Sequence, residues 1–139
     1  MDDVPSFFSW HVNICKINNR KYILFMNDLT RISLLIDGIR TSQLTLLKEK
    51  FLSTLKSYLE SEGIKQSHID LYLKDGSELL ISRTNSRSVL GTMKEAALFS
   101  SDGPRDNIEK MQWLNTIIYK PIDYQQPIKI FKEAIQDHC

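Results

Sequence analysis

The spacing of apolar residues changes once along this chain, and that change constrains the fold more than any other feature. Between residues 10 and 36, apolar side chains occur in the alternating or continuous runs that are typical of β-strands. From residue 42 they recur every three or four positions, as on one face of an α-helix. Strands followed by helices predict an α+β fold, with an antiparallel sheet that several helices cover.

Three strands are expected in the first part of the chain. Residues 10–17 alternate between apolar and polar, as in a half-exposed strand, whereas residues 22–26 are continuously apolar, as in a more deeply buried one. Asn18 and Asn19 tolerate a positive φ and suit the hairpin turn between the two strands. A third strand at residues 31–36 completes an antiparallel β-meander.

A long helix is expected at residues 42–62, and Gly63 can end it in a left-handed conformation. Residues 69–73 fit either a helix or a strand, and residues 78–82 predict a fourth strand. Shorter helices are expected in the last third of the chain. The residues that we expect to be buried in the core are Leu24, Leu47, Phe51, Leu55 and Val89.

Size and charge limit the classes of protein to which the chain can belong. Its 139 residues contain 42% apolar side chains, enough for one compact domain over residues 1–139, in which residues 1–8 are expected to fray. Eighteen Lys and Arg oppose 17 Asp and Glu, for a net charge of +1. A dedicated nucleic-acid binder usually has a clear basic excess, so only a local basic patch is expected here.

The sequence contains no pattern that requires a cofactor, a metal or a membrane. Cys15 and Cys139 lie far apart and lack metal-ligand spacing, so free thiols in a reducing cytosol are expected. The first residues are acidic where a secretory signal would be basic. No apolar run approaches the roughly 18 residues of a membrane span. These features predict a cytoplasmic protein that binds no cofactor and no metal.

The stretch from residue 82 to residue 91 leads from a strand to a helix through a polar loop, and it is the principal candidate site. Such a turn directs free backbone N–H groups outward at the positive end of a helix dipole, where phosphate groups bind. The candidate ligand-binding residues in this turn are Arg83, Asn85, Ser86, Arg87 and Ser88. In the alternative, structural interpretation, Asn85, Ser86 or Ser88 is only the N-cap, and the arginines pair with carboxylates or with loop carbonyls.

A second group of basic residues lies on the turns and strand ends of the meander. This group consists of Lys16, Arg20, Lys21 and Arg31. If the fourth strand pairs with the meander, the group can merge with the Arg83–Ser88 turn. Nearby Trp10 and Tyr22 can stack on bases, although residues of these types at such positions are more often part of the core. The sequence therefore predicts a small non-catalytic binding or regulatory protein that recognises nucleic acid or a phosphate-bearing ligand.

Two other functions remain open. One is a protein-interaction or antitoxin-like accessory module, or a homo-oligomer, whose contact surface would include residues 119–126, held extended between two prolines. The other is a metal-independent nuclease. The sequence shows no recognisable pair of nucleophile and base, but positioned charged residues could stabilise a reacting phosphate. Its candidate residues are His11, Arg31, Arg83 and Arg87.

Several segments together resemble a family of small bacterial and archaeal proteins that is known only as a domain of unknown function. The segments that carry the resemblance are residues 10–13, 20–21, 27–31, 83–93 and 114–115, with Pro121 and Pro127. The resemblance spans most of residues 10–135, and its most specific part is the run RSVLGTM, after which similar members usually have Asn and this chain has Lys94. It implies a single mixed domain from a microbe or its mobile elements, and it implies no particular activity.

Overall fold

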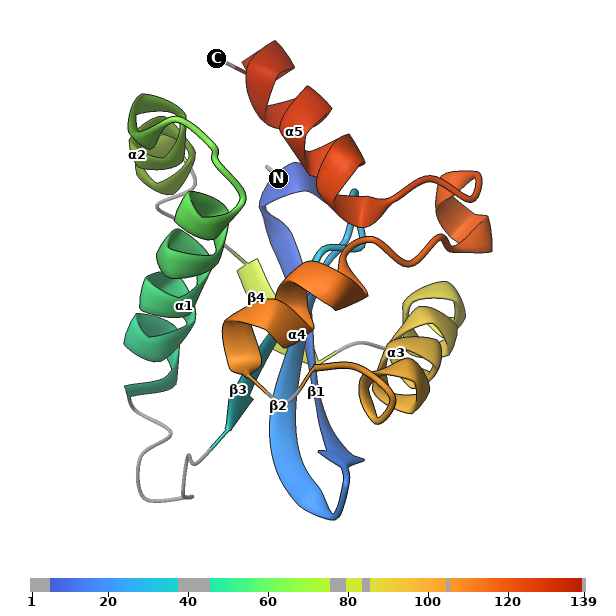
Figure 1. Ribbon diagram of the computed structural model, residues 1–139. Coiled ribbons are helices and arrows are strands. Elements are labelled where there is room, and N and C mark those ends of the chain that lie inside the picture. The colour runs from blue at the N-terminus through green and yellow to red at the C-terminus, as the bar shows by residue number, and fades with distance from the viewer. Residues whose placement is uncertain (1–5, 38–45, 76–79, 84–85, 105, 139) are drawn as a thin grey trace.

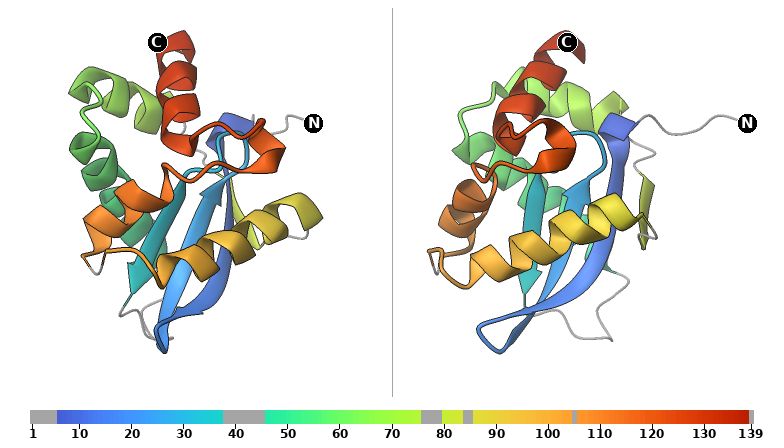
Figure 2. Two further views of the ribbon diagram at one scale, coloured as in Figure 1. Left: turned by 45° about the vertical axis from the view of Figure 1, so that its right-hand side comes forward. Right: turned by 90° about the vertical axis from the view of Figure 1, so that its right-hand side faces the viewer.

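The protein folds into a four-stranded sheet with helices on both faces (Figures 1 and 2), which confirms the expected α+β class. The computed structural model describes residues 6–37, 46–75, 80–83, 86–104 and 106–138. The strands are β1 (Ser9–Ile17), β2 (Arg20–Asn27), β3 (Ser33–Asp37) and β4 (Leu80–Arg83). The helices are η1 (Ser6–Phe8), α1 (Leu47–Ser61), α2 (Gln66–Asp75), α3 (Arg87–Ser100), α4 (Asn107–Leu114), η3 (Lys120–Ile122) and α5 (Pro127–His138).

The strand order is β3-β2-β1-β4. The antiparallel meander of β1, β2 and β3 is confirmed, and the turn between β1 and β2 has positive φ at Asn18 and Asn19 as expected. The expectation of an entirely antiparallel sheet was wrong, because β4 pairs with β1 in parallel. Its direction follows from the path of the chain, which leaves the sheet at the β3 edge, forms α1 and α2, and re-enters beside β1 at the opposite edge.

The long helix ends where expected, and its expected start falls on residues that the structure does not describe. Residues 47–61 form α1, whereas residues 42–45 lie outside the described part of the chain. Gly63 has a φ of +78° and donates its N–H to Glu60 O at 3.1 Å, while Ile64 donates to Leu59 O at 3.3 Å. This pair of bonds is a Schellman motif, which glycine permits at no steric cost. The ambiguous residues 69–73 are helical, within α2.

One core lies between the sheet and α1, α2 and α5. Phe51 of α1 packs its ring 4.6 Å from that of Phe25 and 5.1 Å from that of Trp10. Trp10 is buried and donates its indole N–H to the Tyr72 hydroxyl at 3.2 Å, so it is a core residue and not a free stacking surface. Leu55 is buried as expected, but Leu47 is only partly buried, because it is the first residue of α1.

Of residues 1–8, for which fraying is expected, residues 6–8 form the η1 turn, while residues 1–5 lie outside the described part. Phe7 and Phe8 are buried in the η1 turn. The Phe7 carbonyl accepts a 2.7 Å hydrogen bond from the Tyr72 hydroxyl, and the Phe7 ring lies 5.1 Å from that of Phe131. Aromatic partners from α2 and α5 therefore hold this end of the chain in place.

A second core lies on the opposite face of the sheet, where α3 crosses β1 and β2 (Figure 2, right). Leu24 and Tyr22 of β2 are buried there, as is Val89 of α3, so the core assignments of these residues are confirmed. The Tyr22 side chain is 4% exposed and thus presents little surface for base stacking.

The segment over residues 119–126 is folded back and not extended. Tyr119 is buried, η3 follows it, and Asp123 and Tyr124 both have left-handed backbones, with φ of 55° and 57°. The Tyr124 N–H donates to Tyr119 O at 2.8 Å, which closes the turn. The extended conformation expected from the two prolines was therefore wrong. Within the described residues, no helix combines the length and apolar character needed to cross a membrane.

Candidate functional site

The loop between β2 and β3 is built around one buried amide, that of Asn27. Its Oδ1 accepts hydrogen bonds from Leu29 N at 3.2 Å, from Thr30 N at 3.0 Å and from the Thr30 hydroxyl at 3.0 Å. Its Nδ2 donates to Phe7 O at 3.0 Å. An Asn side chain that accepts from the backbone two and three residues ahead closes a turn by itself. The loop is thus fixed to the η1 segment at one end of the sheet.

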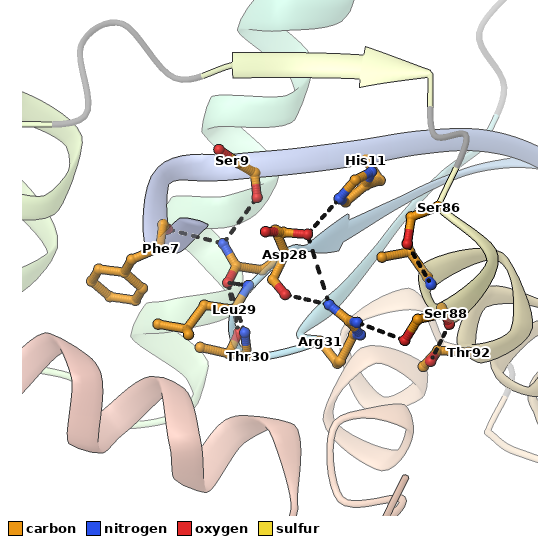
Figure 3. A network of polar contacts seen from close by, with 12 residues as sticks. Phe7, Ser9, His11, Asp28, Leu29, Thr30, Arg31, Ser86, Ser88 and Thr92 are labelled. Atoms are coloured by element: carbon orange, nitrogen blue, oxygen red, sulfur yellow. Dashed lines mark hydrogen bonds and ion pairs between the residues drawn. The ribbon is translucent and has the colours of Figure 1, made fainter. Parts of the chain in front are cut away.

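This loop places Arg31 in an unusual backbone conformation. Arg31 has a φ of 65°, which a residue with a side chain adopts at a cost of roughly 1–2 kcal/mol. Its N–H donates to Asn27 O at 3.0 Å, and the Asn27 N–H donates to Ile32 O at 2.9 Å. The loop therefore stabilises a conformation that Arg31 would not favour on its own. As a result, the Arg31 side chain reaches Ser88 in the first turn of α3 (Figure 3).

Arg31 connects the loop to the first turn of α3. Its Nη2 donates to Ser88 Oγ at 3.1 Å, and its Nη1 donates to the Asp28 carbonyl and lies 3.9 Å from the Asp28 carboxylate. The side chain is only 10% exposed. Burial lowers the pKa of Arg31, and the Asp28 charge opposes this effect, but a guanidinium remains protonated in any case. The Arg31 Nε is buried and has no hydrogen-bond partner among the described residues.

Asp28 also contacts a histidine of β1. His11 Nε2 lies 2.8 Å from Asp28 Oδ1, and the Asp28 N–H donates to Ser9 O at 2.9 Å, so Asp28 is anchored to β1 by both its backbone and its carboxylate. An ionised carboxylate only accepts, which places a proton on His11 Nε2. The other ring nitrogen, Nδ1, is buried and lacks a partner in the described part of the chain.

The first turn of α3 presents unpaired backbone donors. Ser86 is the N-cap and its hydroxyl accepts from Val89 N at 3.4 Å, so the N-cap function of Ser86 is confirmed. The Leu90 N–H donates to Ser86 O at 2.9 Å, and the N–H groups of Arg87 and Ser88 precede the first position that has an intrahelical acceptor. The Arg87 side chain is exposed and forms no ion pair with any described residue.

The structure brings together only part of the basic group that the sequence singles out. Arg31 meets Ser88 and lies beside the turn that carries Ser86 and Arg87. Arg83 ends β4, where its backbone is paired with that of Val12, and Asn85 lies outside the described residues. The fourth strand does pair with the meander, as the merging of the two basic groups required.

Arg20 and Lys21 lie at the far end of the β1–β2 hairpin. Lys21 is six residues before Asn27 on β2, which separates them by about 20 Å. Arg20 instead forms an ion pair with Asp37 at 3.4 Å, and its side chain is 70% exposed. These two residues therefore do not share a site with the first turn of α3.

Asn27 and Asp28 were not anticipated as parts of this site. The signal for Asn27 is its position at the end of a continuously apolar strand, just before polar residues, where an Asn side chain commonly closes a turn. The contact between Asp28 and His11 depends on the β1–β2 register, in which Trp10 is opposite Asn27. No group of three or more His, Cys, Asp or Glu that could hold a metal ion occurs among the residues that the structure describes.

Comparison with known proteins identifies the family. A family model described as "Domain of unknown function (DUF6933)" matches residues 1–130. The chain belongs to this family. A search of curated proteins finds no significant match. The resemblance seen in the sequence is thereby confirmed. Two of the segments that carry the resemblance meet at the candidate site of this DUF6933 member, through the contact between Arg31 and Ser88.

Proposed function

We propose that this protein is a non-catalytic binding protein that recognises an anionic, phosphate-bearing group, free or in a nucleic acid, at the first turn of α3. The observation that carries the proposal is the 3.1 Å contact between Arg31 Nη2 and Ser88 Oγ. It brings a buried guanidinium from a loop 57 residues earlier to the positive end of a helix dipole. The proposal includes a microbial, cytoplasmic setting.

The charges around this turn favour an anion. Asp28 offsets the charge of Arg31, so among the residues that the structure describes the exposed Arg87 is the cation of this turn without an ion-pair partner, beside the first-turn N–H groups of Arg87 and Ser88. Backbone donors and a guanidinium that converge on one point form the usual surroundings of a bound phosphate. The near-neutral charge of the whole chain favours a site for one or a few phosphates over an extended nucleic-acid footprint.

Arg87→Ala tests the proposal, with Lys94→Ala as the matched control. Lys94 is also exposed and lies two turns further along α3, on the same side but away from the free N–H groups. Fluorescence anisotropy at low salt would measure binding of labelled single-stranded RNA, single-stranded DNA and an adenine nucleotide. Arg87→Ala should weaken binding by about tenfold or more, and Lys94→Ala by much less.

Thermal melts of the same variants separate a binding role from a structural one. Both side chains are exposed, so each substitution should change the free energy of unfolding by less than about 0.5 kcal/mol. A loss of roughly 1–3 kcal/mol in Arg87→Ala would assign Arg87 to the fold instead. A wild-type protein that binds none of the three ligands at low salt would refute the site.

The nuclease alternative has one specific observation in its favour, the His11–Asp28 pair. A histidine oriented by a carboxylate is a common general base, but the nitrogen that would act, Nδ1, is buried in this arrangement. Incubation of the labelled RNA and DNA with the protein in EDTA tests the alternative directly. Cleavage that is lost in His11→Gln would replace the binding proposal with a catalytic one.

The protein-interaction alternative is supported by two exposed apolar side chains beside η3. Ile118 is 54% exposed and Tyr124 is 60% exposed. Deleting residues 119–139 would remove the buried Phe131 and disrupt the core, so substitutions are the better test. If this surface mediates self-association, Ile118→Ser with Tyr124→Ser should reduce the mass measured by light scattering; an unchanged monomer mass in both proteins would exclude it.

A further inference from the structure

Lys110 of α4 is a buried cation that no carboxylate neutralises within the described part of the chain. Lys110 as a whole residue is only 2% exposed, and its Nζ lies 5.3 Å from the centroid of the Tyr22 ring. No described Asp or Glu lies within ion-pair distance of it. A cation–π contact stabilises the ammonium group on the ring face, and Nζ is not among the buried side-chain nitrogens that lack a partner, so it is open to the adjacent cleft.

Neighbouring backbone groups do not take the place of a carboxylate partner. Lys110 lies near the C-terminal end of α3, where helix carbonyls would attract a cation. Lys110 Nζ donates to none of the described backbone carbonyls, and those at this helix end already accept one hydrogen bond each from the residues that follow. The bonds run from Ser101 Oγ to Leu98 O at 2.8 Å, from Asp102 N to Phe99 O at 3.0 Å, and from Gly103 N to Ser100 O at 3.2 Å.

Lys110 lines an open cleft of about 550 Å³ between the β1–β2 hairpin and the connection from α3 to α4. Tyr22 forms part of its wall, and Asn18, Arg20 and Ser101 supply polar groups. This volume lies in the range of small-molecule sites, which combine an apolar wall with a few convergent polar groups. Arg20 reaches the cleft from the hairpin, and its side chain is 70% exposed and only partly engaged by Asp37 at 3.4 Å.

We propose that this cleft binds a small anion that carries a carboxylate or phosphate group, with Lys110 as its main contact and Arg20 as a second cation. An anion here would supply the partner that Lys110 lacks, and the Asn18 side-chain amide would donate a hydrogen bond to it. The site is separate from the first turn of α3, because α3 is 14 residues long and the cleft lies at its other end, about 20 Å away. This inference does not depend on the function proposed above.

The test is a titration of ¹⁵N-labelled protein with inorganic phosphate and, separately, with acetate, at an ionic strength held constant with chloride. The readout is the backbone amide signals of Arg20, Tyr22, Ser101 and Gly103, which report on the cleft and not on the first turn of α3. We expect saturable shifts of these signals with at least one anion, and the arm that produces them identifies the group that is bound.

Lys110→Met removes the charge and retains the stem that packs on Tyr22. We expect it to weaken anion binding in the cleft by at least about tenfold, whereas the exposed control Lys129→Met and the distant Arg87→Ala should leave the affinity unchanged. If Lys110→Met fails to fold, the exposed Arg20→Gln replaces it, with an expected loss of about threefold or more. Absence of saturable shifts in the wild type, or wild-type affinity in the folded variant, would overturn the proposal.

Discussion

Asn27→Ala tests whether one buried amide holds the loop that carries Asp28 and Arg31. The Asn27 side chain is fully buried, and four of its hydrogen bonds are 3.2 Å or shorter. Alanine removes all of them at once. One of the partners, the Thr30 N–H, is a buried backbone donor that cannot turn toward another acceptor, whereas the Phe7 carbonyl keeps its hydrogen bond from the Tyr72 hydroxyl.

The expected loss follows from the Thr30 N–H. A buried backbone group left without a partner costs about 1–3 kcal/mol, so the free energy of unfolding should fall by about 1–3 kcal/mol in Asn27→Ala. This is a substantial part of the roughly 5–15 kcal/mol that is typical of a small domain, but it does not exceed it. Phosphate binding at α3 should weaken as well, because the Arg31 N–H loses its fixed acceptor when the loop loosens.

Urea unfolding measures this loss, with Asn13→Ala as the matched control. Asn13 lies on β1, and its side chain makes a single exposed hydrogen bond, from Ile14 N at 2.9 Å. Its removal should cost less than about 0.5 kcal/mol. A loss below about 1 kcal/mol in Asn27→Ala would mean that water satisfies the freed groups, and that Asn27 does not organise the loop.

Three further predictions concern the rest of the fold. Phe51→Ala should lower the free energy of unfolding by about 3–5 kcal/mol in urea titrations, because the side chain is fully buried; a loss below about 1 kcal/mol would contradict this packing. Gly63→Ala should cost about 1 kcal/mol from its φ of +78° alone, since a Cβ there meets no atom within 4 Å, and an unchanged stability would refute the strain. Burial raises the pKa of the Cys15 thiol, so in a Cys139→Ser background Cys15 should react more slowly with iodoacetamide at pH 8 than a free cysteine does, and a rate equal to that of free cysteine would contradict the shift.

The elements with a clear period could be predicted from the sequence. The alternation in β1 and the helical spacing of α1 each reflect a single face that must be buried, and the continuous apolar run of β2 reflects a strand that is buried on both faces. The direction of β4 could not be predicted this way. A strand of four residues looks the same in either direction, and its pairing depends on where the chain returns after α2.

Long-range contacts explain the other differences between prediction and structure. The η1 segment is held in place by Tyr72, 65 residues away, whose hydroxyl donates to Phe7 O and whose ring packs edge-on against the Phe7 ring. A local pattern does not reveal such a partner. Ser86 was one of three possible N-caps in the structural interpretation of the turn, and this assignment is confirmed, whereas the ligand-binding role of the turn stays a prediction. Arg31 reaches α3, and Arg20 does not, because of the conformation of the β2–β3 loop. This conformation is hard to predict from the sequence, since Arg31 has a positive φ that arginine rarely adopts.

An NMR titration of ¹⁵N-labelled protein with AMP at low salt tests the central claim most directly, because it reports on each donor of the site separately. The account predicts that the largest saturable shifts occur at the backbone amides of Arg87 and Ser88 and at the Nε–H of Arg31, and that Arg87→Ala abolishes them. Saturable shifts confined to other parts of the chain, or no saturable shift at all, would contradict the claim that the β2–β3 loop and the first turn of α3 form one anion-binding site.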